Sequence, residues 1–150
     1  WGAIGHGYTY SGHHIGAAAA LCNLNIIERE NLTDNAKTTG AYLQQRMAQT
    51  FADHPMVGES HGVGMLHALE FAADKKNRQG FDANLKVGPL VSAACMAEGM
   101  IARAMPHGDI LGFAPPLIAT PDDVDGMVER AHRAVNKVMN QLIRSGDWKG

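Results

Sequence analysis

The chain has 150 residues, 45% of them hydrophobic and 19% charged, and a formal net charge of -2. This composition is typical of a globular protein of about one domain and excludes a wholly disordered chain. Thirteen Lys and Arg against fifteen Asp and Glu leave no basic field for a phosphate backbone, so no nucleic-acid partner is expected.

The two cysteines, Cys22 and Cys95, each lie in an apolar stretch and form no C-x-x-C pair. They are predicted to be small buried hydrophobic residues in a reducing compartment, which we expect to be the cytoplasm. No apolar run approaches the ~18 residues needed to span a bilayer, so no membrane partner is expected. The chain starts at Trp1 with neither an initiator Met nor a signal-peptide pattern, which suggests a piece of something longer.

Two helices are predicted in the first third of the chain. Residues 14–30 are rich in Ala and Leu and apolar around most of the circumference, so this helix is expected to be buried between layers. A second helix is predicted over 33–53, with Thr33 or Asp34 as its N-cap. Its inner face is marked by apolar residues at i, i+4 and i+8, namely Leu43, Met47 and Phe51.

The central part changes to a period of two. Residues 56–73 alternate as in a strand pair with glycines at the turn or at a bulge. One face of this pair carries Met65, His67, Leu69 and Phe71. A third helix is predicted over 83–98, regular from about Lys86, because Pro89 is tolerated only near the first turn.

Two short strands are predicted next, in "MIARAM" and "DILGFAPPL", before a final helix. Thr120 is its predicted N-cap, Pro121 its first residue, and Asp122 and Asp123 favour the positive end of its dipole. The fold class is therefore α/β in the broad sense, of the α+β kind: a small, mostly antiparallel sheet covered by helices on one face.

The stretch "GHGYTYSGHHIGAAAAL", residues 5–21, leads a glycine-rich loop into a helix. Free backbone N–H groups at the start of a helix suit a phosphate or a carboxylate. Alternatively, Gly5, Gly7 and Gly12 only permit a tight turn and Ser11 caps the helix, since neither a Walker nor a dinucleotide fingerprint is present.

Metal binding and hydrolysis find no support. The eight histidines, among them His6, His13 and His14, lack the spacing of a tetrahedral metal site, so no metal is predicted. No G-x-S-x-G element surrounds any serine.

Arg103 lies inside "GMIARAM", a short apolar strand, rather than on the polar face of a helix. A guanidinium there either reaches water, pairs with an acid or grips a ligand carboxylate at two points. The residues alone leave structural ion pairing and ligand binding both open.

Five segments of the chain carry a resemblance to a known family. In chain order they are "GHGYTYSGHHIGAAAAL", "NIIEREN", "GVGMLHALEF", "GMIARAMPHGDILGFAPPL" and "TPDDVDGMVERA". Together they resemble the C-terminal part of class III pyridoxal-phosphate-dependent aminotransferases. The ω-amino acid:pyruvate transaminases are the most similar subgroup. The resemblance implies a fold type I homodimer, with residues 1–30 ending the large cofactor-binding domain and 31–150 forming the small domain. It also implies amine and keto-acid substrates.

The resemblance assigns cofactor-binding roles to two residues. Thr9 is expected to bind the phosphate of pyridoxal 5'-phosphate through its hydroxyl and N–H, assisted by the N–H of Tyr8, in the active site of the neighbouring subunit. His14 stands where the family commonly has Pro, which should cost rigidity more than chemistry.

Arg103 matches the family's mobile arginine, which pairs with the substrate carboxylate and swings aside for uncharged or bulky groups. Pro115 and Pro116 match a turn that shapes the same site. These assignments make Arg103 the expected substrate-binding residue.

No catalytic residue is expected in this chain. The family's Schiff-base lysine and the aspartate that pairs with the ring nitrogen precede the H-G-Y-T-Y turn, and would fall before Trp1. No lysine of the chain is a convincing substitute, so the chain alone should be inactive. Alternatives are a related aminomutase or decarboxylase, or a stand-alone anion-binding and interaction module.

Overall fold

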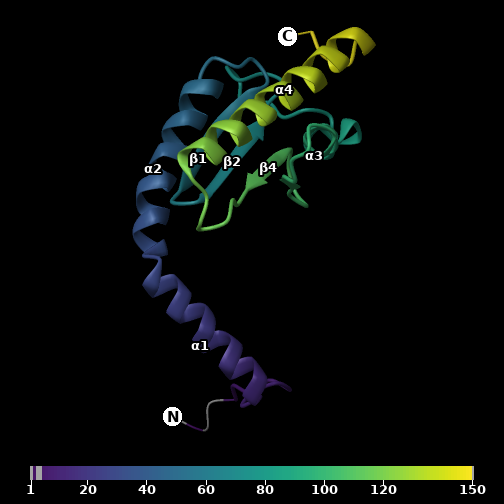
Figure 1. The fold of residues 1–150 in the computed structure, drawn as a ribbon. Helices are drawn as coiled ribbons and strands as arrows, with labels where there is room; N and C mark the ends of the chain where they lie inside the picture. The colour runs from purple at the N-terminus through teal and green to yellow at the C-terminus, as the bar shows by residue number, and fades with distance from the viewer. Residues whose placement is uncertain (1, 3–4, 150) are drawn as a thin grey trace. The chain divides into compact units, whose positions relative to one another are not determined.

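A computed structural model describes residue 2 and residues 5–149 of the chain. It divides into two compact units, residues 1–33 and residues 34–150. Each unit is described by itself below, with the elements labelled as in Figure 1.

The first unit is built around α1 (His14–Arg29). Its N-cap is His13, whose Nδ1 accepts a hydrogen bond from the N–H of Gly16 at 3.2 Å, so the prediction of Ser11 as the cap is wrong. The imidazole replaces the hydroxyl because Ser11 is already engaged in the preceding turn, where its Oγ accepts from the N–H of Tyr8.

The expected burial of α1 is not found within this chain. None of its residues is buried, and Ile15, Leu21 and Leu24 are more than half exposed. Cys22 is exposed, against the prediction, whereas Cys95 is fully buried and burial raises its thiol pKa to about 11. The helix therefore presents an apolar surface that nothing in its own unit covers.

The second unit has a four-stranded antiparallel sheet with the order β1-β2-β4-β3. Its strands are β1 (Val57–Val63), β2 (Leu66–Phe71), β3 (Arg103–Ala104) and β4 (Ile110–Phe113). The helices are α2 (Leu32–Phe51), α3 (Val87–Ala97) and α4 (Pro121–Ser145), with a short 3-10 turn η1 (Ala83–Leu85) before α3. This arrangement confirms the predicted antiparallel sheet with helices.

The helix boundaries follow local chemistry. Thr120 caps α4 in a capping box, since its Oγ1 accepts from the N–H of Asp123 while Asp123 Oδ2 accepts from the Thr120 N–H. The predicted start of α4 is therefore confirmed. α2 begins at Leu32, so Thr33 and Asp34 lie in its first turn rather than at the N-cap.

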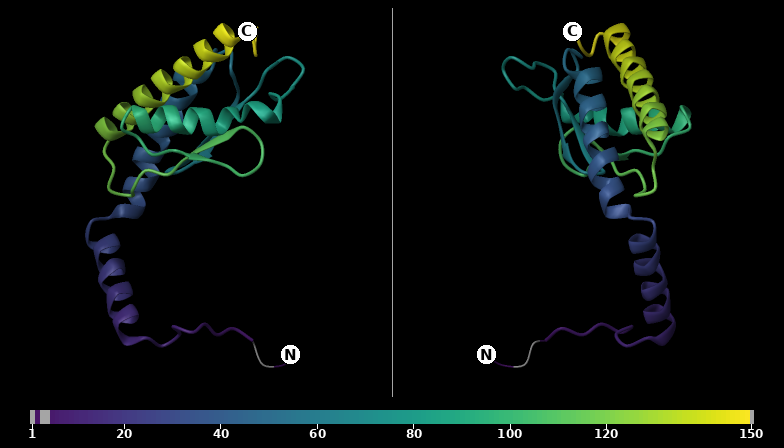
Figure 2. Two further views of the ribbon diagram at one scale, coloured as in Figure 1. Left: turned by 90° about the vertical axis from the view of Figure 1, so that its right-hand side faces the viewer. Right: turned by 60° about the vertical axis from the view of Figure 1, so that its left-hand side comes forward.

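One face of the sheet packs under the helices (Figures 1 and 2). The inward residues of β2 and β4 are His67, Leu69, Phe71, Leu111 and Phe113, all 5% exposed or less. The four apolar residues among them join a core with the inner faces of α2, α3 and α4, which includes Leu43, Met47, Phe51, Val91 and Val128. The alternate residues, such as Ala68 and Glu70, stand on the uncovered face.

α2 lies unusually close to the turn between β1 and β2. A Cβ on Gly40 would come within 2.5 Å of the carbonyl carbon of Gly64, and Gln44 Nε2 donates to the carbonyl oxygens of Gly64 and Leu66 at 2.9 and 3.2 Å. A glycine at position 40 is therefore required by the close approach of two backbones.

Gly40→Ala is expected to lower the free energy of unfolding by about 1–3 kcal/mol, because the collision outweighs the helix propensity gained. Chemical denaturation measures the change. Gly126→Ala in α4 is the matched control, since its new Cβ would meet only the flexible end of Arg130. The control should stabilise by about 0.5–1 kcal/mol; equal stabilisation by both variants would contradict the close approach.

His67 is buried in a hydrogen-bonded chain. Its Nδ1 lies 2.7 Å from Gln44 Oε1 and its Nε2 lies 2.9 Å from Ser60 Oγ. Because the Gln44 amide donates elsewhere, Nδ1 carries the proton and Nε2 accepts from Ser60. Burial, with a smaller contribution from His61, lowers the pKa of His67 to about 4.

Stability should therefore fall in mild acid. The unfolded chain has a histidine pKa of about 6.5, so between that value and about 4 the unfolded state binds more protons than the folded state. The contribution of His67 is complete above pH 6.5 and is lost as the pH falls toward 4, by about 3 kcal/mol in all. Unfolding curves across this range should show the loss in the wild type and less of it in His67→Gln. The exposed His61→Gln should keep most of the slope.

Candidate functional site

The N-terminal turn brings hydrogen-bond donors to its apex. Ser11 N–H donates to the Tyr8 carbonyl at 2.9 Å, closing a turn over residues 8–11. Within the described part of the chain, the N–H and hydroxyl of Thr9 have no hydrogen-bond partner. The Tyr8 N–H donates to Ser11 Oγ at 3.0 Å, so in this conformation Tyr8 does not offer the donor predicted for it.

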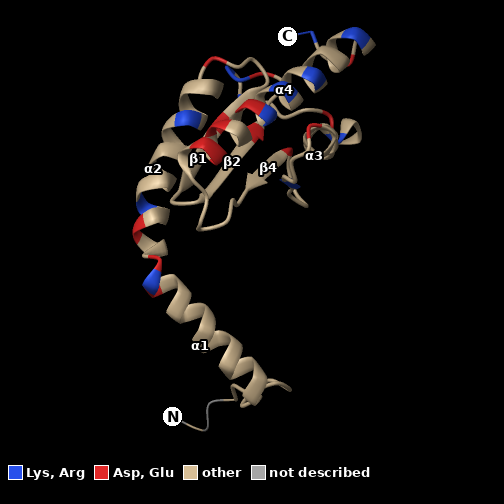
Figure 3. Cartoon of the chain, viewed as in Figure 1, with Lys and Arg blue, Asp and Glu red and all other residues tan. Residues whose placement is uncertain are grey.

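The same region carries no formal charge from Asp, Glu, Lys or Arg. The first such residue in the sequence is Glu28, followed by Arg29 at the end of α1 (Figure 3). Free donors without a neighbouring carboxylate fit the oxygens of a phosphate group, which are acceptors. Because no lysine or arginine is near in sequence, the neutralising charge would have to come from outside residues 1–27.

Arg103 stands on the uncovered face of the sheet. Arg103 on β3 is paired with Gly112 on β4. Gly112 is paired in turn with Ala68 on β2, and Ala68 with His61 on β1. These four residues therefore form one row across the sheet. All four line an open cavity of about 380 Å³, here called the Arg103 cavity. Its other lining residues are Gly62, Val63, Leu66, His67, Met105, Phe113 and Ala114.

Arg103 forms no ion pair or side-chain hydrogen bond with any residue that the structure describes. The structural ion-pair alternative therefore has no partner within residue 2 and residues 5–149. An unpaired guanidinium beside a largely apolar cavity is suited to a ligand carboxylate.

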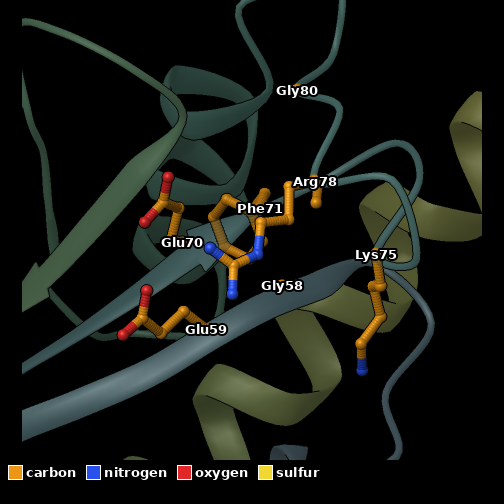
Figure 4. A pocket seen from close by; sticks show the side chains of 8 residues that line it. Gly58, Glu59, Glu70, Phe71, Lys75, Arg78 and Gly80 are labelled. Carbon is orange, nitrogen blue, oxygen red and sulfur yellow. The ribbon is translucent and has the colours of Figure 1, made fainter.

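Acidic residues on the same face gather elsewhere. Glu59 and Glu70 are directly opposite each other on β1 and β2, in a cavity of about 520 Å³ that Lys75 and Arg78 also line (Figure 4). Carboxylates directly opposite each other on neighbouring strands repel. Neither glutamate lines the Arg103 cavity.

The proline turn adjoins the Arg103 cavity without lining it. Pro115 and Pro116 line a separate cavity of about 470 Å³, together with Met100, Ile101 and Ile118. Phe113 and Ala114 line both cavities, so the turn is connected to the Arg103 cavity through two residues.

Other kinds of site are not found among the described residues. No three His, Cys, Asp or Glu side chains gather as a metal site there, and no described helix is long and apolar enough to cross a membrane. All six lysines are exposed: Lys37, Lys75, Lys76, Lys86, Lys137 and Lys149. A lysine that acts as a nucleophile is usually desolvated, so none of these has the required surroundings.

Sequence reasoning missed the small residues beside Arg103. Ala68 and Gly112 are distant in sequence from each other, and only strand pairing brings them into one row. The missing signal is the register, which depends on which residues of each strand are buried.

Comparison with known proteins now defines the family. The aminotransferase class-III family model matches residues 1–135, and the chain belongs to this pyridoxal-phosphate-dependent family. A diaminobutyrate--2-oxoglutarate transaminase from Halomonas elongata is 62% identical over 97% of this chain and 31% of its own length. A putrescine--pyruvate aminotransferase from Pseudomonas aeruginosa is 41% identical over 95% of this chain and 30% of its own.

The solved structures agree in fold. A transaminase from directed evolution by ancestral reconstruction has a TM-score of 0.90 and 67% identity, covering 95% of this chain and 31% of that one. The predicted resemblance to the C-terminal part of class III transaminases is thereby confirmed. The chain spans about a third of the length of these relatives.

Arg103→Met is expected to change the free energy of unfolding by no more than about 0.5 kcal/mol, since no partner is lost. Arg46→Met is the matched control. Arg46 Nε donates to Asp125 Oδ1 at 2.6 Å, so Arg46→Met removes an ion pair and should destabilise the fold more than Arg103→Met does. Denaturation of both variants provides the comparison; a cost at Arg103 equal to that at Arg46 would indicate a structural role.

Proposed function

We propose that the chain is the C-terminal part of an aminotransferase that moves an amino group from an amine or ω-amino acid to a keto acid such as pyruvate. The observation that carries this proposal is Arg103, an unpaired guanidinium beside an apolar cavity in a class III aminotransferase segment. The cavity has one arginine and no lysine or carboxylate, which favours a substrate with a single carboxylate, such as pyruvate.

The named activities of the relatives support this choice without fixing the acceptor. One relative uses putrescine and pyruvate, another diaminobutyrate and 2-oxoglutarate. Both donors carry an amino group at the end of a carbon chain. We therefore propose a terminal amine as the donor. We also propose the cytoplasm as the compartment of the protein.

Each site residue has a distinct task in this proposal. Arg103 binds the substrate carboxylate through two parallel N–H donors and, being exposed, can swing aside when the substrate has none. Thr9 donates its hydroxyl and N–H to the cofactor phosphate of the partner subunit in a homodimer, and the Tyr8 N–H joins once Ser11 releases it. Pyridoxal phosphate, when bound, supplies the electron sink for transamination.

The chain alone is proposed to be inactive. Its six lysines are exposed, and the residue that would bond covalently to the cofactor lies outside these 150 residues. The stand-alone anion-binding module remains the competing function, because the Thr9 turn offers donors in either case.

Thr9→Ala in the full-length parent is expected to weaken cofactor binding by about 10- to 100-fold, because the hydrogen bond from the hydroxyl to an anion is lost while the backbone N–H is kept. Equilibrium dialysis against pyridoxal phosphate measures the affinity, and turnover with a terminal amine and pyruvate measures the activity. Ser145→Ala, a hydroxyl removed at the far end of α4, is the matched control and should bind like the wild type.

Two outcomes would contradict the proposal. The first is a wild-type parent with no turnover of any amine with pyruvate. The second is a borohydride-stable cofactor adduct at one lysine of the isolated 150-residue chain, because the proposal places the anchor elsewhere. Phosphate bound by the monomeric chain alone would favour the anion-binding module.

A further inference from the structure

The residue next to Arg103 on the uncovered face is a glycine that the backbone does not require. Gly112 lies within β4 and is not among the glycines with positive φ. A glycine inside a strand weakens it and often marks a place where a ligand or another backbone approaches closely. No described backbone takes up the space, because the first atom that a Cβ on Gly112 would meet is the methyl carbon of Met105, at 2.3 Å.

The neighbouring row position is also small. Ala68 is opposite Gly112 on β2, so two small residues lie between the guanidinium of Arg103 and the imidazole of His61. The methyl group of Met105 lies against Gly112, so the floor of the cavity between Arg103 and His61 is formed by Ala68 and by this methyl group. Leu66 also lines the cavity.

We propose that Gly112, with Ala68, determines how wide a substrate the Arg103 cavity accepts. The carboxylate is held by Arg103, and the hydrocarbon part next to it lies over Ala68 and over the Met105 methyl group, which the glycine at position 112 allows to lie against the strand. A side chain at position 112 displaces Met105 into the cavity and excludes branched or aromatic groups, while small carboxylates still reach Arg103. This inference rests on the proposed function, since it takes the cavity to be the substrate site.

Binding of two carboxylates to the full-length holoenzyme tests the proposal. Propanoate and phenylacetate share the carboxylate and differ in width, and NMR titration gives their dissociation constants without turnover. Gly112→Val is expected to weaken phenylacetate at least tenfold and propanoate less than threefold. Arg103→Met should weaken the binding of both carboxylates to a similar degree, because both lose the guanidinium. This result would distinguish loss of the carboxylate partner from a change in the width of the cavity.

A second substitution addresses the collision directly. Met105→Ala in the Gly112→Val background should restore at least half of the lost phenylacetate affinity, on a logarithmic scale. If Gly112→Val does not fold, the same pair is measured with Gly112→Ala. Gly80→Ala is the matched control: it adds a methyl group in open space outside the cavity and should leave both affinities unchanged.

Different results would overturn the proposed function and the role of Gly112. A wild type that binds both carboxylates but has no transamination with pyruvate overturns the proposed function. A wild type that transaminates, with Gly112→Val weakening both carboxylates equally or neither, overturns the role of Gly112. Loss of affinity in Gly80→Ala would also overturn it, because the effect would then not depend on the cavity.

Discussion

The burial of Leu69 and Leu111 under the helices is the constraint on which the candidate site depends. Side chains of a strand alternate between faces, so burying these two residues places their neighbours Ala68 and Gly112 on the uncovered face. Ala104 is paired with Leu111, and Arg103 is therefore carried to the same face as Gly112. A shift of one residue between β3 and β4 would turn the guanidinium toward the covered face.

The two candidate regions offer different kinds of group to an anion. The Thr9 turn has hydrogen-bond donors without a cation, and the Arg103 cavity has a cation beside an apolar floor. Uncharged donors fix the orientation of a bound anion and add modest affinity. An arginine in apolar surroundings supplies most of the attraction for a carboxylate. The first region therefore suits a ligand anchored elsewhere, and the second a ligand that must arrive and leave.

Much of the second unit could be predicted from the sequence because its signals are local. Thr120, Pro121 and Asp123 specify the start of α4 within four residues, and the alternation from Met65 to Phe71 specifies which face is buried. Signals of this kind depend on backbone chemistry and burial within a few residues.

The wrong predictions have equally specific causes. His13 caps α1 in place of Ser11 because the Ser11 hydroxyl already accepts a hydrogen bond from the Tyr8 N–H. The apolar composition of α1 predicts burial, but composition does not say which residues would cover the helix, and none of its residues is buried in the structure. The position of Gly112 beside Arg103 and Ala68 cannot be predicted from the sequence, because only strand pairing brings these residues together.

The length and the edge position of β3 determine how freely the Arg103 side chain can move. The strand has two residues, Arg103 and Ala104, and lies at the edge of the sheet, paired with β4 alone. The N–H of Met105, directly after it, also donates to the carbonyl oxygen of Ile110. The backbone at Arg103 is thus fixed by its pairing, while its side chain has a neighbouring strand on one side only. A guanidinium held at its base and free along its stem can lie beside the Arg103 cavity or turn past the edge of the sheet, and this freedom follows from the position of β3.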